Sequence, residues 1–234
     1  MTSARTENPS AAEGTRLPAA VLWDMDGTLV DTEPYWLTCE FELVEAFGGS
    51  WSDADSEAIL GSPLLVSAEY MRVNGGIDLP AEEIVSRLLD RMVRTVRRRT
   101  PWQPGARELL DGLVAAGVPC ALVTQSYRVL AEAVLDVLPP GTFAAVVTGE
   151  QVRNGKPHPE PYLEAARRLG VPAAECVAIE DSPAGVTSAA AAGAAVLAVA
   201  RGVPVPDGPD REVVTTLEGV TPAHLARLVR ATTG

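Results

Sequence analysis

The chain has 234 residues, of which 47% are hydrophobic and 21% are charged, and its formal net charge at pH 7 is −12. This composition is ordinary for a globular protein of one or two domains, and no apolar run approaches the roughly 18 residues that a membrane span needs. The negative charge argues against a nucleic-acid partner, because contacts to a phosphate backbone need Lys and Arg.

The N-terminal segment and the cysteines bear on where the protein works. Residues 1–16 are rich in Ser, Thr, Ala and Glu and lack the apolar stretch of a secretory signal, which predicts a disordered tail. The three cysteines, Cys39, Cys120 and Cys176, form no C-x-x-C pair, and we interpret them as buried thiols in a reducing compartment. We therefore expect a cytoplasmic monomer without a membrane partner.

The first half of the chain predicts one strand followed only by helices. Residues 19–23 form a short apolar run that is typical of a buried strand. The next segment contains no convincing strand, and its apolar spacing predicts helices over residues 33–47, 53–60, 65–73 and 80–99. An insertion directly after the carboxyl end of a strand should lie above the ligand-binding edge of a sheet, where it is placed to work as a lid.

The second half of the chain alternates between helices and strands. The predicted helices cover residues 106–116, 127–138, 159–169, 183–192 and 221–229, and the predicted strands cover residues 119–124, 144–148, 176–179 and 195–200. Strands separated by helices in this way indicate parallel βαβ units. We predict an α/β protein with a doubly wound parallel-sheet (Rossmann-like) core over residues 17–31 and 101–234. An all-helical cap domain is inserted over residues 32–100.

Two acids follow the first predicted strand directly. Asp24 and Asp26 are separated by one residue and are followed by Gly27. Asp is depleted in strands, and the carboxyl ends of parallel strands are where such sheets bind ligands. Two neighbouring carboxylates repel each other and need a cation or a proton between them. A plain Asp-Gly turn is an equally good interpretation of this stretch on its own.

Polar residues also follow the other predicted strands. They are Thr124-Gln125-Ser126, Lys156 after Asn154-Gly155, and the pair Glu180-Asp181. In a parallel sheet these positions share one edge, which would then hold four acids, a hydroxyl and an ammonium. Such oxygen ligands suit Mg²⁺, and a hydroxyl beside a Lys suits a phosphate group.

Each of these residues has a plain structural alternative. Thr124 could be an ordinary β-branched strand residue, Lys156 a turn residue, and Glu180-Asp181 a helix N-cap. Their joint placement on one edge of the sheet favours a functional site over these alternatives.

These residues carry a resemblance to a known family. The motifs Asp24-Met25-Asp26-Gly27-Thr28, Thr124, Gly155-Lys156-Pro157 and Glu180-Asp181 occur in one order along the chain. In this order they resemble the haloacid dehalogenase-like superfamily of phosphotransferases, in the branch with a helical cap after the first motif. The resemblance covers residues 18–201.

The resemblance implies a role for each motif residue. Asp24 would be the nucleophile that forms an aspartyl-phosphate, and Asp26 the general acid and base. Mg²⁺ would be held by Asp24, the backbone carbonyl of Asp26 and Asp181, with Glu180 acting through water. The remaining predicted contacts are to the phosphoryl oxygens, from the side chains of Thr124 and Lys156 and from backbone N–H groups around Gly27 and Gln125.

Three residues separate the possible members of this family. In the dehalogenase branch that the motifs also resemble, a Tyr occupies the position of Asp26. Carbon–halogen hydrolysis is therefore not expected. Residues 29–34 resemble the β-phosphoglucomutase-like group, but Leu64 stands where those mutases have a phosphate-gripping Arg, and Trp36 where they tend to have His. Trp36 and Leu64 are also our candidates for substrate specificity, with the alternative that they belong to the core of the cap.

We therefore predict a phosphoric monoester hydrolase. The predicted enzyme is a Mg²⁺-dependent phosphatase that acts on a small phosphorylated metabolite, a sugar phosphate or a similar compound. The alternatives are a sugar-phosphate mutase of the β-phosphoglucomutase type and a non-catalytic binding protein on the same fold.

Overall fold

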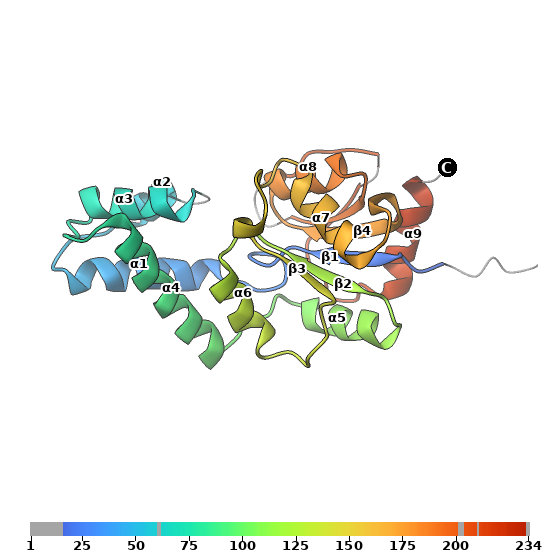
Figure 1. Ribbon diagram of the computed structural model, residues 1–234, viewed down its shortest axis with the longest axis horizontal. Coiled ribbons are helices and arrows are strands. Elements are labelled where there is room, and N and C mark those ends of the chain that lie inside the picture. The colour runs from blue at the N-terminus through green and yellow to red at the C-terminus, as the bar shows by residue number, and fades with distance from the viewer. Residues whose placement is uncertain (1–15, 60–61, 201–203, 210, 233–234) are drawn as a thin grey trace, which may run out of the picture.

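The computed structural model describes residues 16–59, 62–200, 204–209 and 211–232. The predicted tail therefore lies outside the described residues, apart from Arg16. The described chain forms a parallel sheet with helices on both faces and a separate group of helices at one end (Figure 1). This arrangement confirms the predicted α/β fold with a helical cap. The residue bounds of the two domains remain a prediction.

The sheet has the strand order β3-β2-β1-β4-β5-β6, with every neighbouring pair parallel. Its strands are β1 (Ala20–Trp23), β2 (Cys120–Val123), β3 (Ala145–Val147), β4 (Cys176–Glu180), β5 (Ala195–Val199) and β6 (Arg211–Val214). Because the chain runs outward from β1 to β3 on one side and from β4 to β6 on the other, the order reverses between β1 and β4. Ligands of open α/β sheets bind at such a reversal, beyond the carboxyl ends of the strands.

Both faces of the sheet are covered, which explains why its central strands are apolar throughout. Along β1, Val21 and Trp23 face one hydrophobic cluster, and Ala20 and Leu22 face the other. The first cluster is completed by residues of α5 (Ala106–Ala115), α6 (Arg128–Leu135) and α9 (Pro222–Thr232). The second is completed by residues of α7 (Glu160–Leu169) and α8 (Pro183–Ala191).

The cap consists of α1 (Glu33–Ala46), α2 (Asp53–Ile59), α3 (Leu64–Asn74) and α4 (Ala81–Arg98). The apolar face of α4, which includes Ile84, Leu88 and Met92, is buried in the same cluster as Met71 of α3. None of the described helices is long and apolar enough to cross a membrane.

The two chain segments that join the cap to the core lie against each other. Val30 and Trp102 form an antiparallel bridge, and the N–H of Asp31 donates to the carbonyl of Pro101 over 2.7 Å. Further along, α4 runs beside α6 of the core (Figure 1), where Arg97 and Asp136 form an ion pair of 2.7 Å. The cap is therefore joined to the core by two paired segments, and it also contacts the core through α4 and α6.

The structure differs from the predicted elements mainly at their ends. Helix α6 ends at Leu135 rather than at Leu138, before the Pro139-Pro140 pair, and β4 continues to Glu180 rather than ending at Ile179. Strand β6 and two short 3₁₀ helices, Gly149–Gln151 and Ala173–Glu175, were not predicted from the sequence. Within the described part of the chain, β6 pairs only with β5, and none of its residues is fully buried, so it lacks the apolar run that marks an inner strand.

A tight contact at Gly105 provides a test of the core packing. Gly105 has φ +79°, and a Cβ there would lie 2.2 Å from the carbonyl carbon of Leu217. We expect Gly105→Ala to lower the free energy of unfolding in urea by about 2–4 kcal/mol, from backbone strain and overpacking together.

Gly117→Ala is the matched control, because Gly117 has φ +70° and open space where its Cβ would lie. It should cost only the strain, about 1–2 kcal/mol. Equal losses in the two variants would contradict the packing argument.

Candidate active site

Three carboxylates meet where the strand order reverses. Asp24 follows β1, Glu180 is the last residue of β4, and Asp181 comes next. One oxygen from each of these side chains lies within 4.8 Å of the other two. Asp24 is 7% exposed and Glu180 is fully buried. Their negative charges therefore repel each other with little screening by water, and the group needs positive charge nearby.

Lys156 supplies part of that charge from the loop before α7. Its ammonium donates to Asp24 Oδ1 over 2.6 Å, to Glu180 Oε1 over 2.6 Å and to the carbonyl of Val123 over 2.9 Å. An ammonium has three donors, so all of them are used. The side chain is only 3% exposed, and its position is fixed by these three bonds.

Glu180 is the second carboxylate that accepts from Lys156. In addition to Lys156, its Oε1 accepts from the Tyr162 hydroxyl over 2.5 Å, and its Oε2 accepts from the Ser182 hydroxyl over 3.2 Å and from the Ser182 N–H over 3.4 Å. A Cβ on Gly185 would lie 1.9 Å from this carboxylate, so α8 approaches it closely. Since a carboxylate has about four acceptor positions, Glu180 has few left for a further ligand.

Asp181 is placed by the loop that follows β1. The Thr28 hydroxyl donates to Asp181 Oδ1 over 3.1 Å. Gly27 has φ +87°, and a Cβ there would lie 2.1 Å from Asp181 Oδ2. The Gly27 carbonyl accepts from the side-chain amide of Gln103 over 2.9 Å. Gly27 is therefore required both for the turn and for the approach of the Asp181 carboxylate.

Asp26 lies in a different environment from Asp24. Its Oδ1 accepts from the Thr32 hydroxyl over 2.6 Å, and its Oδ2 accepts from the Ser126 hydroxyl over 2.6 Å and from the Thr124 hydroxyl over 3.3 Å. Its side chain is not part of the three-carboxylate cluster. The two acids of the first motif are thus separated into one beside a buried ammonium and one among hydroxyls.

The remaining predicted residues, Thr124, Gln125, Trp36 and Leu64, differ in how deeply they are buried. Thr124 is buried at the end of β2, whereas Gln125 is exposed, with its side-chain carbonyl against Gly155. Trp36 and Leu64 are half-buried and pack against the hydrophobic cluster that runs from one face of the sheet into the cap. Their role in substrate specificity and their role in the cap core both stay predictions.

Sequence reasoning missed several side chains that hold the site together. They are Thr28, Thr32, Gln103, Ser126 and Tyr162. Thr28 and Ser126 stand inside the quoted motifs, so a search for hydroxyls beside the acids would have found them. Gln103 stands in the loop before α5 and Tyr162 inside α7, and no local pattern marks either of them.

The charges of the site shift the pKa values of its groups. Burial, together with the charges of Glu180 and Asp181, raises the pKa of Asp24 well above its ordinary value. Burial and the charge of Glu180 raise the pKa of Asp181 to about 6. Burial by itself would lower the pKa of Lys156, but the charges of Asp24 and Glu180 outweigh it and raise that pKa. The site therefore carries more negative charge than Lys156 balances.

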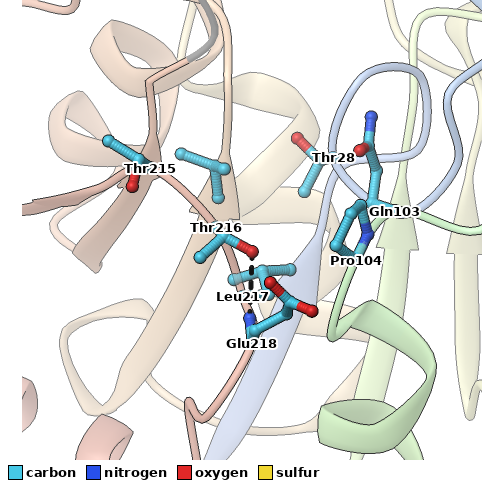
Figure 2. Close-up of a pocket in the computed structure, with 8 residues that line it drawn as sticks. Thr28, Gln103, Pro104, Thr215, Thr216, Leu217 and Glu218 are labelled. Atoms are coloured by element: carbon cyan, nitrogen blue, oxygen red, sulfur yellow. Dashed lines mark hydrogen bonds between the residues drawn. The ribbon is translucent and has the colours of Figure 1, made fainter.

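A cavity of about 280 Å³ adjoins the site on the side of β5 and β6 (Figure 2). It is lined by Thr28, Gln103, Pro104, Val199, Thr215, Thr216, Leu217 and Glu218. Figure 2 shows the bond from the Glu218 N–H to the Thr216 hydroxyl, 3.2 Å long, on the wall opposite Thr28 and Gln103. Thr28 and Gln103 thus separate this cavity from Asp181 and Gly27, and the cavity itself does not contain the carboxylate cluster.

The chain is similar to several known proteins. Residues 18–193 match the family model of the haloacid dehalogenase-like hydrolases. The chain is 35% identical over 186 residues to hexitol phosphatase A of Escherichia coli, which covers 76% of this chain and 81% of that protein. It is 32% identical over 179 residues to hexitol phosphatase B of the same organism, and this match covers 74% of this chain and 79% of that protein. The crystal structure of CbbY from Rhodobacter sphaeroides in complex with phosphate has a TM-score of 0.75 at 25% identity, and covers 87% of this chain and 96% of that one.

The acid cluster predicts a pH-dependent response to Mg²⁺. Protonation of Asp181 below its pKa of about 6 removes a ligand oxygen from a cation. Because that pKa is raised, the same protonation also stabilises the metal-free fold as the pH falls. At about 100 times its dissociation constant, Mg²⁺ should raise the melting temperature by about 5–10 °C at pH 7.5.

This increase in melting temperature should fall to about half at pH 5, because a pKa of about 6 leaves about a tenth of Asp181 ionised there and weakens Mg²⁺ binding about tenfold. Asp181→Asn should abolish it at both pH values, while Asp111→Asn, on the exposed side of α5, should keep it. A response to Mg²⁺ that is the same at pH 5 and pH 7.5 would contradict a site built on Asp181.

Proposed function

The chain belongs to the haloacid dehalogenase-like hydrolases, and we propose that it is a Mg²⁺-dependent phosphatase that hydrolyses a small phosphomonoester through an aspartyl-phosphate. The observation that carries the proposal is the buried Lys156 ammonium between Asp24 and Glu180, next to Asp181 at the switch point of the sheet. A carboxylate can attack a phosphate dianion only where positive charge offsets their repulsion. Lys156 supplies one such charge beside Asp24.

The donor set of the site fits Mg²⁺. Asp24 and Asp181 offer carboxylate oxygens close together, and the glycine at position 27 leaves room for the second of them. Hard oxygen ligands from one or two carboxylates, with the rest from water and substrate, are what Mg²⁺ prefers. We propose that Asp24, Asp181 and the backbone carbonyl of Asp26 hold the ion, and that Glu180 supports the site through Lys156. When bound, Mg²⁺ would neutralise phosphoryl charge and orient the phosphate.

Asp24 would carry out the first half of the reaction. One of its carboxylate oxygens attacks phosphorus and the ester P–O bond breaks, which gives an aspartyl-phosphate and an alkoxide. Thr124 and Lys156 would hold the phosphoryl oxygens during this step, Lys156 by exchanging one of its three present acceptors for an oxygen of the substrate. Asp26 would give its proton to the leaving oxygen and then take one from the water that hydrolyses the aspartyl-phosphate. The separate hydroxyl environment of Asp26 supports this division, since its carboxylate shares no hydrogen bond with Lys156.

The substrate we propose is the monophosphate of a sugar or a sugar alcohol. The names of two relatives, hexitol phosphatases A and B, support a polyol phosphate. Leu64 also brings no charge to the position at which the resembling mutases bind a second phosphate with an Arg. Four cap arginines form ion pairs with acids, namely Arg72, Arg87, Arg91 and Arg97 with Glu69, Glu83, Glu42 and Asp136.

We further propose that the protein works as a cytoplasmic monomer on a small metabolite, without nucleic acid. Its net charge of −12 disfavours a polyanionic partner. Cys39, Cys120 and Cys176 are buried free thiols, which agrees with a reducing compartment.

Replacing the proposed nucleophile tests the reaction. Asp24→Asn should lower phosphate release from a phosphomonoester by at least about 10³-fold, because an amide cannot form the aspartyl-phosphate. Release is measured colorimetrically with and without Mg²⁺. Asp111→Asn removes an exposed carboxylate of α5 that pairs with Arg107, and it should leave the rate unchanged. Full activity of Asp24→Asn would show that the nucleophile is assigned wrongly.

A panel of phosphorylated metabolites tests the substrate class. We expect kcat/KM for a hexitol or hexose monophosphate to exceed that for the matching bisphosphate by at least about tenfold, or ~1.4 kcal/mol. The reason is that the second phosphate would meet no cationic grip at Leu64. A coupled assay with β-glucose 1-phosphate separates the alternatives. Conversion to glucose 6-phosphate that outpaces phosphate release would establish a mutase, and binding without turnover would establish a binding protein.

A further inference from the structure

We infer that Tyr162 is a positioning residue of the active site, whose hydroxyl fixes Glu180 so that the Lys156 ammonium stays directed at Asp24. This inference rests on the proposed phosphatase function. It assigns a role to a residue that lies outside the sequence motifs and that reaches the reacting groups only through Glu180 and Lys156.

The contact is short and entirely buried. Tyr162 and Glu180 have no exposed surface, and the Tyr162 hydroxyl donates to Glu180 Oε1 over 2.5 Å. The same oxygen accepts from the Lys156 ammonium over 2.6 Å. The ammonium in turn donates to Asp24 Oδ1 over 2.6 Å. A continuous chain of hydrogen bonds therefore joins Tyr162 to the proposed nucleophile.

Tyr162 contacts Lys156 through its ring as well. The Lys156 nitrogen lies 5.3 Å from the centroid of that ring, within the range of a cation–π interaction. The ring is packed in the hydrophobic cluster between the sheet and α7, with Ala165 and Val186 among its other members. A side chain locked by packing in this way can hold its hydroxyl at one place relative to Glu180.

A neutral donor suits this position better than a cation. A second ammonium or guanidinium at Glu180 would compete with Lys156 and would reduce the negative charge that attracts a metal ion to Asp24 and Asp181. The Tyr162 hydroxyl instead satisfies one acceptor position of Glu180 without changing the charge of the site. Burial and the charge of Glu180 raise the pKa of Tyr162 well above its ordinary value, so the donor keeps its proton.

Loss of the hydroxyl should therefore change the position of the Lys156 ammonium. Without it, Glu180 Oε1 would be compensated by the ammonium alone and would attract it more strongly, which draws the ammonium away from Asp24 and from the proposed phosphoryl site. Residues that orient a ligand-binding group by a hydrogen bond, without touching the ligand, typically contribute about 10–100-fold to activity or affinity.

Tyr162→Phe tests this inference, because it removes the hydroxyl and keeps the ring. Isothermal titration calorimetry with inorganic phosphate, in buffer containing Mg²⁺, should show an affinity about 10-fold weaker than in the wild type. The affinity for Mg²⁺ alone, titrated without phosphate, should change less than about threefold, because Asp24 and Asp181 are untouched. In steady-state assays kcat should fall about 10–100-fold.

Thr142→Val is the matched control. Thr142 is also buried, and its hydroxyl donates to the carbonyl of Pro139 over 2.7 Å, near the amino end of β3 and thus at the opposite edge of the sheet. It should keep both affinities and the wild-type rate. All titrations are made below the melting temperature of each variant, so that a loss of stability is not counted as a loss of affinity.

A second variant separates positioning from general packing. In a Glu180→Gln background, Tyr162→Phe should change phosphate affinity by less than about threefold, because the hydroxyl acts through that carboxylate. Wild-type phosphate affinity in Tyr162→Phe, or an equal loss in both backgrounds, would overturn the inference. If the wild type released no phosphate from any ester, the proposed function would fail, while the phosphate titrations would still decide the role of Tyr162.

Discussion

The ammonium of Lys156 is buried among carboxylates, and the geometry of the site depends on that burial. Removing one partner from such a group leaves an uncompensated buried charge, which typically costs about 3–5 kcal/mol. Buried ion pairs are often no more stabilising than apolar residues of the same size. Their presence here is therefore better explained by the site than by stability. Because Lys156 uses all three of its donors, Asp24 and Glu180 can occupy only a narrow range of positions around it.

The parallel sheet makes this arrangement possible. Strands β1 and β4 are parallel neighbours, and the strand order of the sheet reverses between them. Asp24 and Glu180-Asp181 therefore lie at the same crevice. Glycines then allow the acids to approach the loops around them. Gly27 lies against Asp181, and Gly185 lies against Glu180, each at a distance that no side chain would permit. The glycines of the motifs are thus needed for the positions of the acids as well as for their turns.

Much of the fold could be predicted from the sequence, because its signals are local. The apolar runs of β1, β2, β4 and β5 and the spacing of apolar residues in α4 survive in the structure with ends shifted by only a few residues. Strand β6 was missed because an edge strand with half-exposed residues has no such run. The role of Tyr162 was missed for a different reason, since a buried Tyr in an amphipathic helix looks like any other core residue until its hydroxyl partner is known.

The alternation of strands and helices, the helical insertion and the kinds of group at the ends of the strands can all be predicted from the amino-acid sequence. Those properties follow from residue types and from their spacing along the chain. The different partners of the acids become visible only in the folded chain, where Asp24 lies beside Lys156, Asp26 lies among hydroxyls and Glu180 accepts from Tyr162. These partners are set by contacts between residues as far apart as the 132 positions from Asp24 to Lys156 and the 153 from Thr28 to Asp181. Such contacts depend on the order of the strands and the packing of the helices, which no local pattern contains.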